Sequence, residues 1–315
     1  QQVKEKIKSG EITIQDRPGI HRPSTKLLEK DNVQMVIHRT VHEDEYWHGE
    51  LLDLNTTPQI VFEDDNLLVI NKPPFMCTHP TGKHLFNCAT TIYENIYHKT
   101  IHSIHRLDRE TSGILLLGKE LKTTSALTQA FEDSKIKKCY LFIAKIQESY
   151  NEATEFEVNL RLGTTETDLK RVYINNYPQD SNLGQVASTY FKVISVNNGY
   201  AVGLAFPKTG RQHQIRVHAM SIGLPLVGDK LYLGNFEMFQ RFKDNFATEE
   251  DHSLMEIPRH ALHAFAIEIP YQQQSCRLFS EIPEDILMLI NSKLQLENKS
   301  ILDDLKSSCN QYFDL

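Results

Sequence analysis

The 315-residue sequence lacks the features that define several common classes of protein. Its five cysteines are an odd, scattered set without a Cys-x-x-Cys pair, which argues against both a disulfide framework and a structural zinc site. No apolar run approaches the ~20 residues of a membrane span, and the N-terminus has no signal-peptide pattern. We therefore expect an intracellular protein with no membrane partner, placed first in the cytoplasm, with the nucleus and the mitochondrion as open alternatives.

The sequence also lacks an excess of basic residues, because its formal net charge is −7. The charges are unevenly distributed. Residues 101–145 hold eight Lys and Arg against five Asp and Glu, and residues 208–218 hold three against none, whereas residues 281–315 hold three against seven. Positive charge that gathers on two segments is compatible with binding to the phosphates of a nucleic acid, although ordinary solvated charges give the same counts.

The most informative tract spans residues 105–115, which read His-Arg-Leu-Asp-Arg-Glu-Thr-Ser-Gly-Ile-Leu. It places Asp108 between two arginines, and flanking guanidinium groups keep a carboxylate ionised and oriented. The Thr-Ser-Gly turn then leads into an apolar run that is expected to enter a core. By composition alone, a solvated loop with ordinary ion pairs is the more frequent explanation of such a tract.

The order His-Arg-Leu-Asp-x-x-Thr-Ser-Gly resembles the catalytic signature of the RluA-like family of RNA pseudouridine synthases, in which the aspartate is the catalytic residue. The resemblance covers roughly residues 59–270. Further segments follow in the order of that family, namely residues 61–73 with a Lys-Pro turn, Lys-Lys-Cys-Tyr at 137–140, Lys-Thr-Gly-Arg-Gln-His-Gln-Ile-Arg-Val-His at 208–218, and residues 225–232. The sequence departs from the pattern at Pro74-Phe75-Met76, where the family has a single small residue.

The order of the expected elements indicates an α+β fold. Short alternating strands at residues 140–144 and 188–194 are mixed with a helix at 123–133, without regular βαβα alternation and without a Gly-x-Gly-x-x-Gly loop. This disfavours a nucleotide-binding doubly wound sheet. The resemblance implies the same class, as the pseudouridine synthase fold has a mixed, largely antiparallel central sheet with flanking helices.

We divide the chain into a small N-terminal module at 1–50, a linker at 51–58, a catalytic domain at 59–282 and a C-terminal helical tail at 283–315. The module reads as a helix at 3–9, a strand at 10–14, a loop, and a second strand at 33–37. This order is similar to part of a small RNA-binding domain that precedes many RluA-like enzymes, in a divergent or truncated form. A β-hairpin appendage fits equally well. In the tail, an apolar stripe is expected to pack on the body, and it consists of Ile286, Leu287, Leu289 and Ile290.

The resemblance implies roles for three catalytic residues. Asp108 is the carboxylate that acts near the sugar, by attack on the sugar, attack on the base or removal of a sugar proton. Arg211 would hold that carboxylate ionised as a bidentate partner, unless it binds a phosphate instead. Tyr140 would stack on the uracil and place its hydroxyl near the reacting base, although a tyrosine in a strand is more often part of a core.

Four further residues are expected to bind the substrate. Arg106 would fill the space that a flipped-out nucleotide vacates, with simple salt bridging as the alternative. His105 would bond a phosphate or support the loop, Val217 would form an apolar wall against the base, and Lys208 would contact the RNA. The histidine pairs of the sequence lack the carboxylates or cysteines of a metal site, so we expect neither a metal nor a cofactor.

The leading hypothesis is therefore an RNA pseudouridine synthase, an isomerase, with a monomer as the default state. The N-terminal pattern and the His38-Arg39 stretch resemble eukaryotic relatives that modify a uridine in the anticodon stem-loop of tRNA, so tRNA ranks above ribosomal RNA as the partner. Two other classes stay open. One is a catalytically silent RNA-binding protein with the same fold. The other is a hydrolase such as a glycosidase, which needs a second carboxylate that faces Asp108, for example Glu110.

Overall fold

The computed structural model describes residues 2–17, 19–35, 43–82, 84–164 and 172–315. The chain divides into two compact units, Gln1–Glu43 and Asp44–Leu315. Residues 44–50, which the sequence groups with the N-terminal module, fall in the larger unit because the ring of Trp47 stacks on that of Phe242, with centroids 5.9 Å apart. None of the helices in the described parts of the chain is both long and apolar enough to cross a membrane.

Within its described residues, the smaller unit contains one helix and one two-stranded antiparallel sheet. Helix α1 spans Gln2–Lys8, and β1 (Ile12–Ile14) pairs with β2 (Val33–Met35). The expected second strand reached residue 37, but positions 36 and 37 lie outside the described residues, as do His38 and Arg39.

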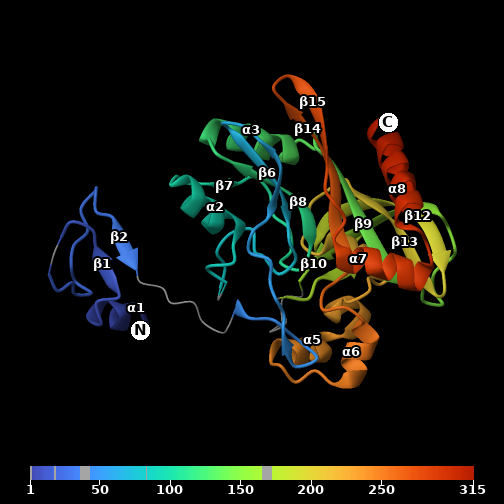
Figure 1. Ribbon diagram of the computed structural model, residues 1–315, viewed down its shortest axis with the longest axis horizontal. Helices are drawn as coiled ribbons and strands as arrows, with labels where there is room; N and C mark the ends of the chain where they lie inside the picture. The colour runs from blue at the N-terminus through green and yellow to red at the C-terminus, as the bar shows by residue number, and fades with distance from the viewer. Residues whose placement is uncertain (1, 18, 36–42, 83, 165–171) are drawn as a thin grey trace. The chain divides into compact units, whose positions relative to one another are not determined.

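The larger unit is built around an 11-stranded sheet (Figure 1) with the strand order β11-β10-β12-β13-β9-β14-β8-β6-β5, in which β15 also pairs with β14 and β7 with β8. Among the described pairings, β14 and β8 run parallel and the rest are antiparallel. The expected α+β fold with a mixed, largely antiparallel sheet is thus confirmed. The strands are β5 (Gln59–Glu63), β6 (Leu67–Lys72), β7 (His102–Ser103), β8 (Ser112–Gly118), β9 (Lys137–Lys145), β10 (Glu155–Gly163), β11 (Asn175–Tyr177), β12 (Gln185–Asn197), β13 (Tyr200–Pro207), β14 (Leu262–Tyr271) and β15 (Gln274–Phe279); β3 (Tyr46–Trp47) and β4 (Glu50–Leu51) form a separate hairpin.

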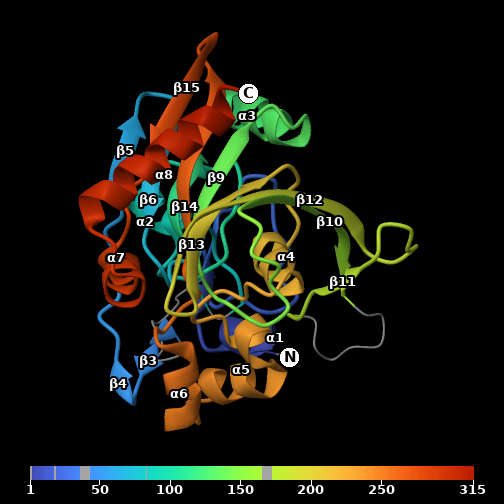
Figure 2. The ribbon, with the colours of Figure 1, turned by 90° about the vertical axis from the view of Figure 1, so that its right-hand side faces the viewer.

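Helices cover both faces of this sheet, as the alternation along β9 requires. Leu141 and Ile143 point to the face that packs against the C-terminal helices, whereas Phe142 and Ala144 point to the face that packs against α4. Figure 2 shows α4 beside β10 and β12. The helices are α2 (Ala89–Tyr97), α3 (Leu121–Glu132), α4 (Gln214–Ser221), α5 (Phe236–Lys243), α6 (Glu249–Met255), α7 (Glu284–Leu289) and α8 (Asn298–Phe313), with the short π-helices η2 (Lys230–Gly234) and η3 (Ile290–Leu294).

The C-terminal tail packs on the body of the larger unit, as the apolar stripe predicts. Ile286 and Ile290 are fully buried, Leu289 is almost so, and all three belong to one core cluster with residues of β9 and β13. The predicted helix at 123–133 corresponds to α3, and the predicted strands at 140–144 and 188–194 lie within β9 and β12.

Candidate active site

Asp108 lies in the turn between β7 and β8, where its carbonyl accepts a hydrogen bond from the backbone N–H of Thr111 at 3.0 Å. The turn enters β8 through Gly113, whose φ is +108° and whose position leaves no room for a side chain, because a Cβ there would lie 2.3 Å from the carbonyl oxygen of Ala264. This close approach to β14 fixes the turn against the sheet. Asp108 opens into a cleft of about 510 Å³.

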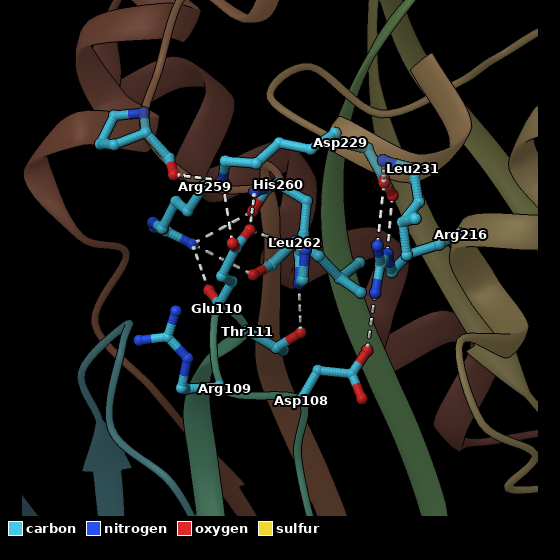
Figure 3. Close-up of polar contacts among 12 residues, drawn as sticks. Asp108, Arg109, Glu110, Thr111, Arg216, Asp229, Leu231, Arg259, His260 and Leu262 are labelled. Carbon is cyan, nitrogen blue, oxygen red and sulfur yellow. Dashed lines mark hydrogen bonds and ion pairs between the residues drawn. The ribbon is translucent and has the colours of Figure 1, made fainter. Parts of the chain in front are cut away.

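Arg216, in the first turn of α4, holds two carboxylates at once (Figure 3). Its Nε and Nη2 donate to the two oxygens of Asp229 at 2.6 and 2.8 Å, and its Nη1 donates to Oδ2 of Asp108 at 3.2 Å. Asp229 is fully buried, and its Oδ1 also accepts the backbone N–H groups of Leu231 and Tyr232, each at 3.1 Å. Asp229 therefore orients the guanidinium, which presents its remaining nitrogen to Asp108.

The charges around Asp108 keep it ionised at neutral pH. Burial by itself raises the pKa of this carboxyl, but the imidazole of His213, once it is protonated in acid, and the guanidinium of Arg216 outweigh burial and lower the pKa to about 2. At neutral pH the positive charge beside Asp108 is that of Arg216. Burial likewise opposes the charge of Arg216, yet the neighbouring Asp229 and Asp108 raise the pKa of its guanidinium above the usual range. The site thus presents an oriented carboxylate that can act as a nucleophile or a base.

The predicted ion pair between Asp108 and Arg211 is wrong, because the structure gives this contact to Arg216. Arg211 is exposed at the cleft, and its Nε donates to the carbonyl of Val186 at 3.2 Å. The reason is local: residue 211 precedes α4, whereas residue 216 sits on the helix face that points to the β7–β8 turn. Arg211 is exposed in the cleft, which is compatible with contact to a phosphate, the alternative role that the sequence left open for it.

Tyr140 lines the cleft from β9, together with Lys138 two residues earlier on the same face of the strand. Burial raises the pKa of the Tyr140 hydroxyl, and the charge of Asp108 adds to the effect, so the phenol stays protonated. Burial lowers the pKa of Lys138 to about 8, and its Nζ donates to the carbonyl of Thr209 at 3.0 Å. Lys138 was not predicted from the sequence, although it lies two residues before Tyr140 and therefore on the same face of the strand.

The cleft also brings together Arg106, His105 and Lys208. Arg106 is exposed, and its side chain makes no hydrogen bond or ion pair with any residue that the structure describes. His105 supports the loop, the second of its two expected roles, because its Nε2 accepts the backbone N–H of Leu116 at 3.0 Å. The Nζ of Lys208 lies 2.9 Å from the carboxylate of Glu157.

Val217 does not form the expected apolar wall of the cleft. Its side chain is fully buried in a separate core cluster with Leu231 and Tyr232. Successive side chains of a helix are rotated by about 100° around its axis. Because Arg216 is directed at Asp108, Ile215 and Val217 point to opposite sides of it. Ile215, on the other side, lines the cleft instead.

Glu110 is held outside the cleft, although it follows Asp108 by only two residues (Figure 3). One of its carboxylate oxygens accepts from Nζ of Lys230 at 2.8 Å, the other accepts from the backbone N–H of His260 at 3.1 Å, and Glu110 is not among the residues that line the cleft. Glu110 is therefore not placed as the second carboxylate of a hydrolase. In the described part of the chain, no group of three or more His, Cys, Asp or Glu side chains is arranged to hold a metal ion.

Comparison with known proteins agrees with this geometry. The family model described as RNA pseudouridylate synthase matches residues 66–221. Ribosomal large subunit pseudouridine synthase D of Blochmanniella floridana is 30% identical over 250 residues, which cover 76% of this chain and 74% of the relative. The chain belongs to the RNA pseudouridylate synthase family. It is an RNA pseudouridine synthase, and the interpretation as a silent RNA-binding protein is not needed to explain its site.

Other relatives of this pseudouridine synthase differ in the RNA that their names specify. Ribosomal large subunit pseudouridine synthase D of Pseudomonas aeruginosa is 28% identical, with 90% of this chain and 84% of the relative covered. The mitochondrial tRNA pseudouridine(32) synthase of Saccharomyces cerevisiae is 31% identical, with 73% of this chain and 46% of the relative covered. Among solved structures, human RNA pseudouridylate synthase domain containing 4 matches with a TM-score of 0.58 at 22% identity, over 74% of this chain and 92% of that one, which supports the fold.

Proposed function

We propose that this pseudouridine synthase isomerises a uridine in the anticodon stem-loop of tRNA. The observation that carries the reaction is the ionised Asp108, held by Arg216 in a cleft that Tyr140 also lines. A cleft of about 510 Å³ lies in the usual size range of small-molecule sites, so the target nucleotide must leave its stack to enter it. Unstacking requires the least free energy for a base that is already single-stranded, which favours a loop.

The choice of tRNA over ribosomal RNA is supported by one named relative. The tRNA pseudouridine(32) synthase of Saccharomyces cerevisiae matches this chain at 31% identity, and the ribosomal enzymes of Pseudomonas aeruginosa and Blochmanniella floridana match it at 28% and 30%. Identity alone therefore does not separate the two substrates. Position 32 of tRNA is the first uridine to test, and ribosomal RNA is the second candidate.

The proposal is tested by mapping pseudouridine in total tRNA and rRNA, from cytoplasm and from mitochondria, in cells with and without this protein. The purified enzyme is then given unmodified transcripts of the RNAs that lose a pseudouridine. We expect the loss of one anticodon stem-loop pseudouridine, which wild-type enzyme restores and Asp108→Asn does not. Loss confined to ribosomal RNA would overturn the tRNA assignment, and equal activity of Asp108→Asn would contradict the role of Asp108.

A further inference from the structure

His213 faces the same oxygen of Asp108 as Arg216 does. It sits directly before α4, with a φ of +54° that turns its side chain toward the β7–β8 turn. Its Nε2 lies 3.9 Å from Oδ2 of Asp108, and its side chain is 11% exposed and lines the cleft. The histidine is therefore a nearly buried group at the reacting end of the site.

Tyr232 determines which nitrogen of His213 carries the proton. The hydroxyl oxygen of Tyr232 lies 2.9 Å from Nδ1 of His213 and accepts the backbone N–H of Ile174 at 3.0 Å. Burial raises the pKa of Tyr232, so the phenol keeps its hydrogen and donates it to Nδ1. This network places the proton of a neutral imidazole on Nε2, directed at Asp108.

The imidazole of His213 is neutral at physiological pH. Burial lowers its pKa, the adjacent Arg216 lowers it further, and the opposing effects of Asp108 and Asp229 leave it at about 4. His260 also disfavours its protonation. His213 thus offers one hydrogen-bond donor to the cleft, without a charge.

The distance between donor and acceptor leaves room for one substrate atom. At 3.9 Å, Nε2 of His213 and Oδ2 of Asp108 are too far apart for a direct hydrogen bond, but an oxygen about 2.8 Å from each can bridge them. That oxygen must accept a hydrogen bond from the imidazole and donate one to the carboxylate. A hydroxyl does both, whereas a uracil carbonyl only accepts and its imide N–H only donates.

We propose that His213 and Asp108 together bind the 2′-hydroxyl of the target nucleotide, with Tyr232 as a positioning residue for His213. Within an RNA chain the 3′ and 5′ oxygens are esterified, so the 2′-hydroxyl is the free hydroxyl that a ribose offers. This contact places the sugar beside Asp108 and distinguishes RNA from DNA at the reacting nucleotide. The inference rests on the isomerisation of a uridine and does not depend on which RNA carries that uridine.

The test is a double-mutant cycle between the enzyme and its substrate. Single-turnover rates are measured on one stem-loop that wild-type enzyme modifies, with either uridine or 2′-deoxyuridine at the target position. For wild type we expect the 2′-deoxy substrate to react at least about tenfold more slowly, because it loses the hydrogen bonds to both His213 and Asp108. For His213→Ala we expect the single-turnover rate on the ribose substrate to fall by a similar factor. The ratio of the rates on the ribose and 2′-deoxy substrates, which we call the 2′-deoxy effect, should be at least about threefold smaller in His213→Ala than in wild type.

Two further variants separate the proposed contact from a merely structural role. His213→Gln keeps a side-chain N–H donor and is expected to restore most of the rate and the 2′-deoxy effect. Tyr232→Phe removes the group that fixes the tautomer, so we expect a partial loss of rate with little change in the dissociation constant of the RNA. A 2′-deoxy effect of the same size in wild type and His213→Ala, or no rescue by glutamine, overturns the proposal. Failure of wild type on every RNA would instead contradict the proposed function.

Discussion

Arg216 contacts both Asp229 and Asp108 with three of its nitrogen atoms, which a lysine side chain cannot do. Replacement by lysine keeps the positive charge beside Asp229 but loses the fork that reaches Asp108. We therefore expect Arg216→Lys to lower the single-turnover rate by about 10- to 100-fold, equivalent to roughly 1.4–2.7 kcal/mol in the barrier. Circular dichroism should show the same fold as in wild type.

The matched variant for this prediction is Arg211→Ala, because Arg211 belongs to the same sequence segment and is exposed at the cleft. Its loss is expected to raise KM for RNA while kcat stays within about twofold of wild type, as for a residue that binds uniformly in the ground and transition states. If Arg211→Ala lowered kcat as strongly as Arg216→Lys, the assignment of the aspartate partner to Arg216 would be wrong.

These two arginines show how far sequence alone reaches at the residue scale. The tract around Asp108 and the segment at 208–218 were both identified from the order of their residues. The segment contains arginines five residues apart, and only the start of α4 at Gln214 decides which of them faces Asp108. Helix phase at a single boundary is among the least predictable features of a sequence, so the segment was predictable and the residue was not.

At the scale of elements, the turn that carries Asp108 is tied to the rest of the larger unit at several points. The carbonyl of Arg109 accepts a hydrogen bond from the buried Nζ of Lys72 at 3.1 Å, and its guanidinium pairs with Glu45 at 2.8 Å. The side chain of Glu110 pairs with Lys230 of η2 at 2.8 Å. Residues of β6, of η2 and of the segment just before β3 thus fix one turn, which holds Asp108 in place.

The pair between Glu110 and Lys230 permits a direct test of this support. The two side chains are 20% and 11% exposed, so Glu110→Gln leaves a largely buried ammonium group without its counter-charge. We expect the free energy of unfolding to fall by about 3 kcal/mol and the rate to fall with it. Denaturant unfolding and single-turnover rates measure the two effects.

The double variant Glu110→Gln/Lys230→Met serves as the control, because it removes both charges together. At least half of the lost stability should return, since the unpaired ammonium is gone. Additive losses in the double variant would show that the two side chains do not interact across the turn.

At the scale of the whole molecule, the local elements of the large sheet were predictable but their order in space was not. The spacing of apolar residues along the sequence predicts strands at β9 and β12 and a helix at α3. The placement of β14 between β9 and β8 does not, because it joins segments more than 100 residues apart, and nothing in the sequence of β14 identifies its neighbours. This placement also sets Ala264 against Gly113, which is the contact that fixes the turn that carries Asp108.

The interior of the larger unit contains neutral histidines that make its stability depend on pH. His218 and His263 are fully buried, and burial lowers the pKa of His218 to about 4 and that of His263 to about 3. In the unfolded chain a histidine titrates near ~6.5. Their contribution to stability is therefore complete above pH 6.5 or so and is lost as the pH falls toward these lower values, because the unfolded state binds the protons first.

We expect the free energy of unfolding to fall by up to about 1.4 kcal/mol per pH unit for each of these histidines between roughly pH 6 and pH 4. Trp47, the single tryptophan, packs against Phe242 and His252, so its fluorescence follows unfolding of the larger unit. In His218→Asn the amide can keep a hydrogen bond to Thr189, which lies 3.0 Å from Nδ1 in the wild type, but it does not titrate. In this variant the slope of the free energy of unfolding against pH should decrease by the equivalent of about one bound proton. An unchanged slope would show that His218 does not contribute to the acid sensitivity.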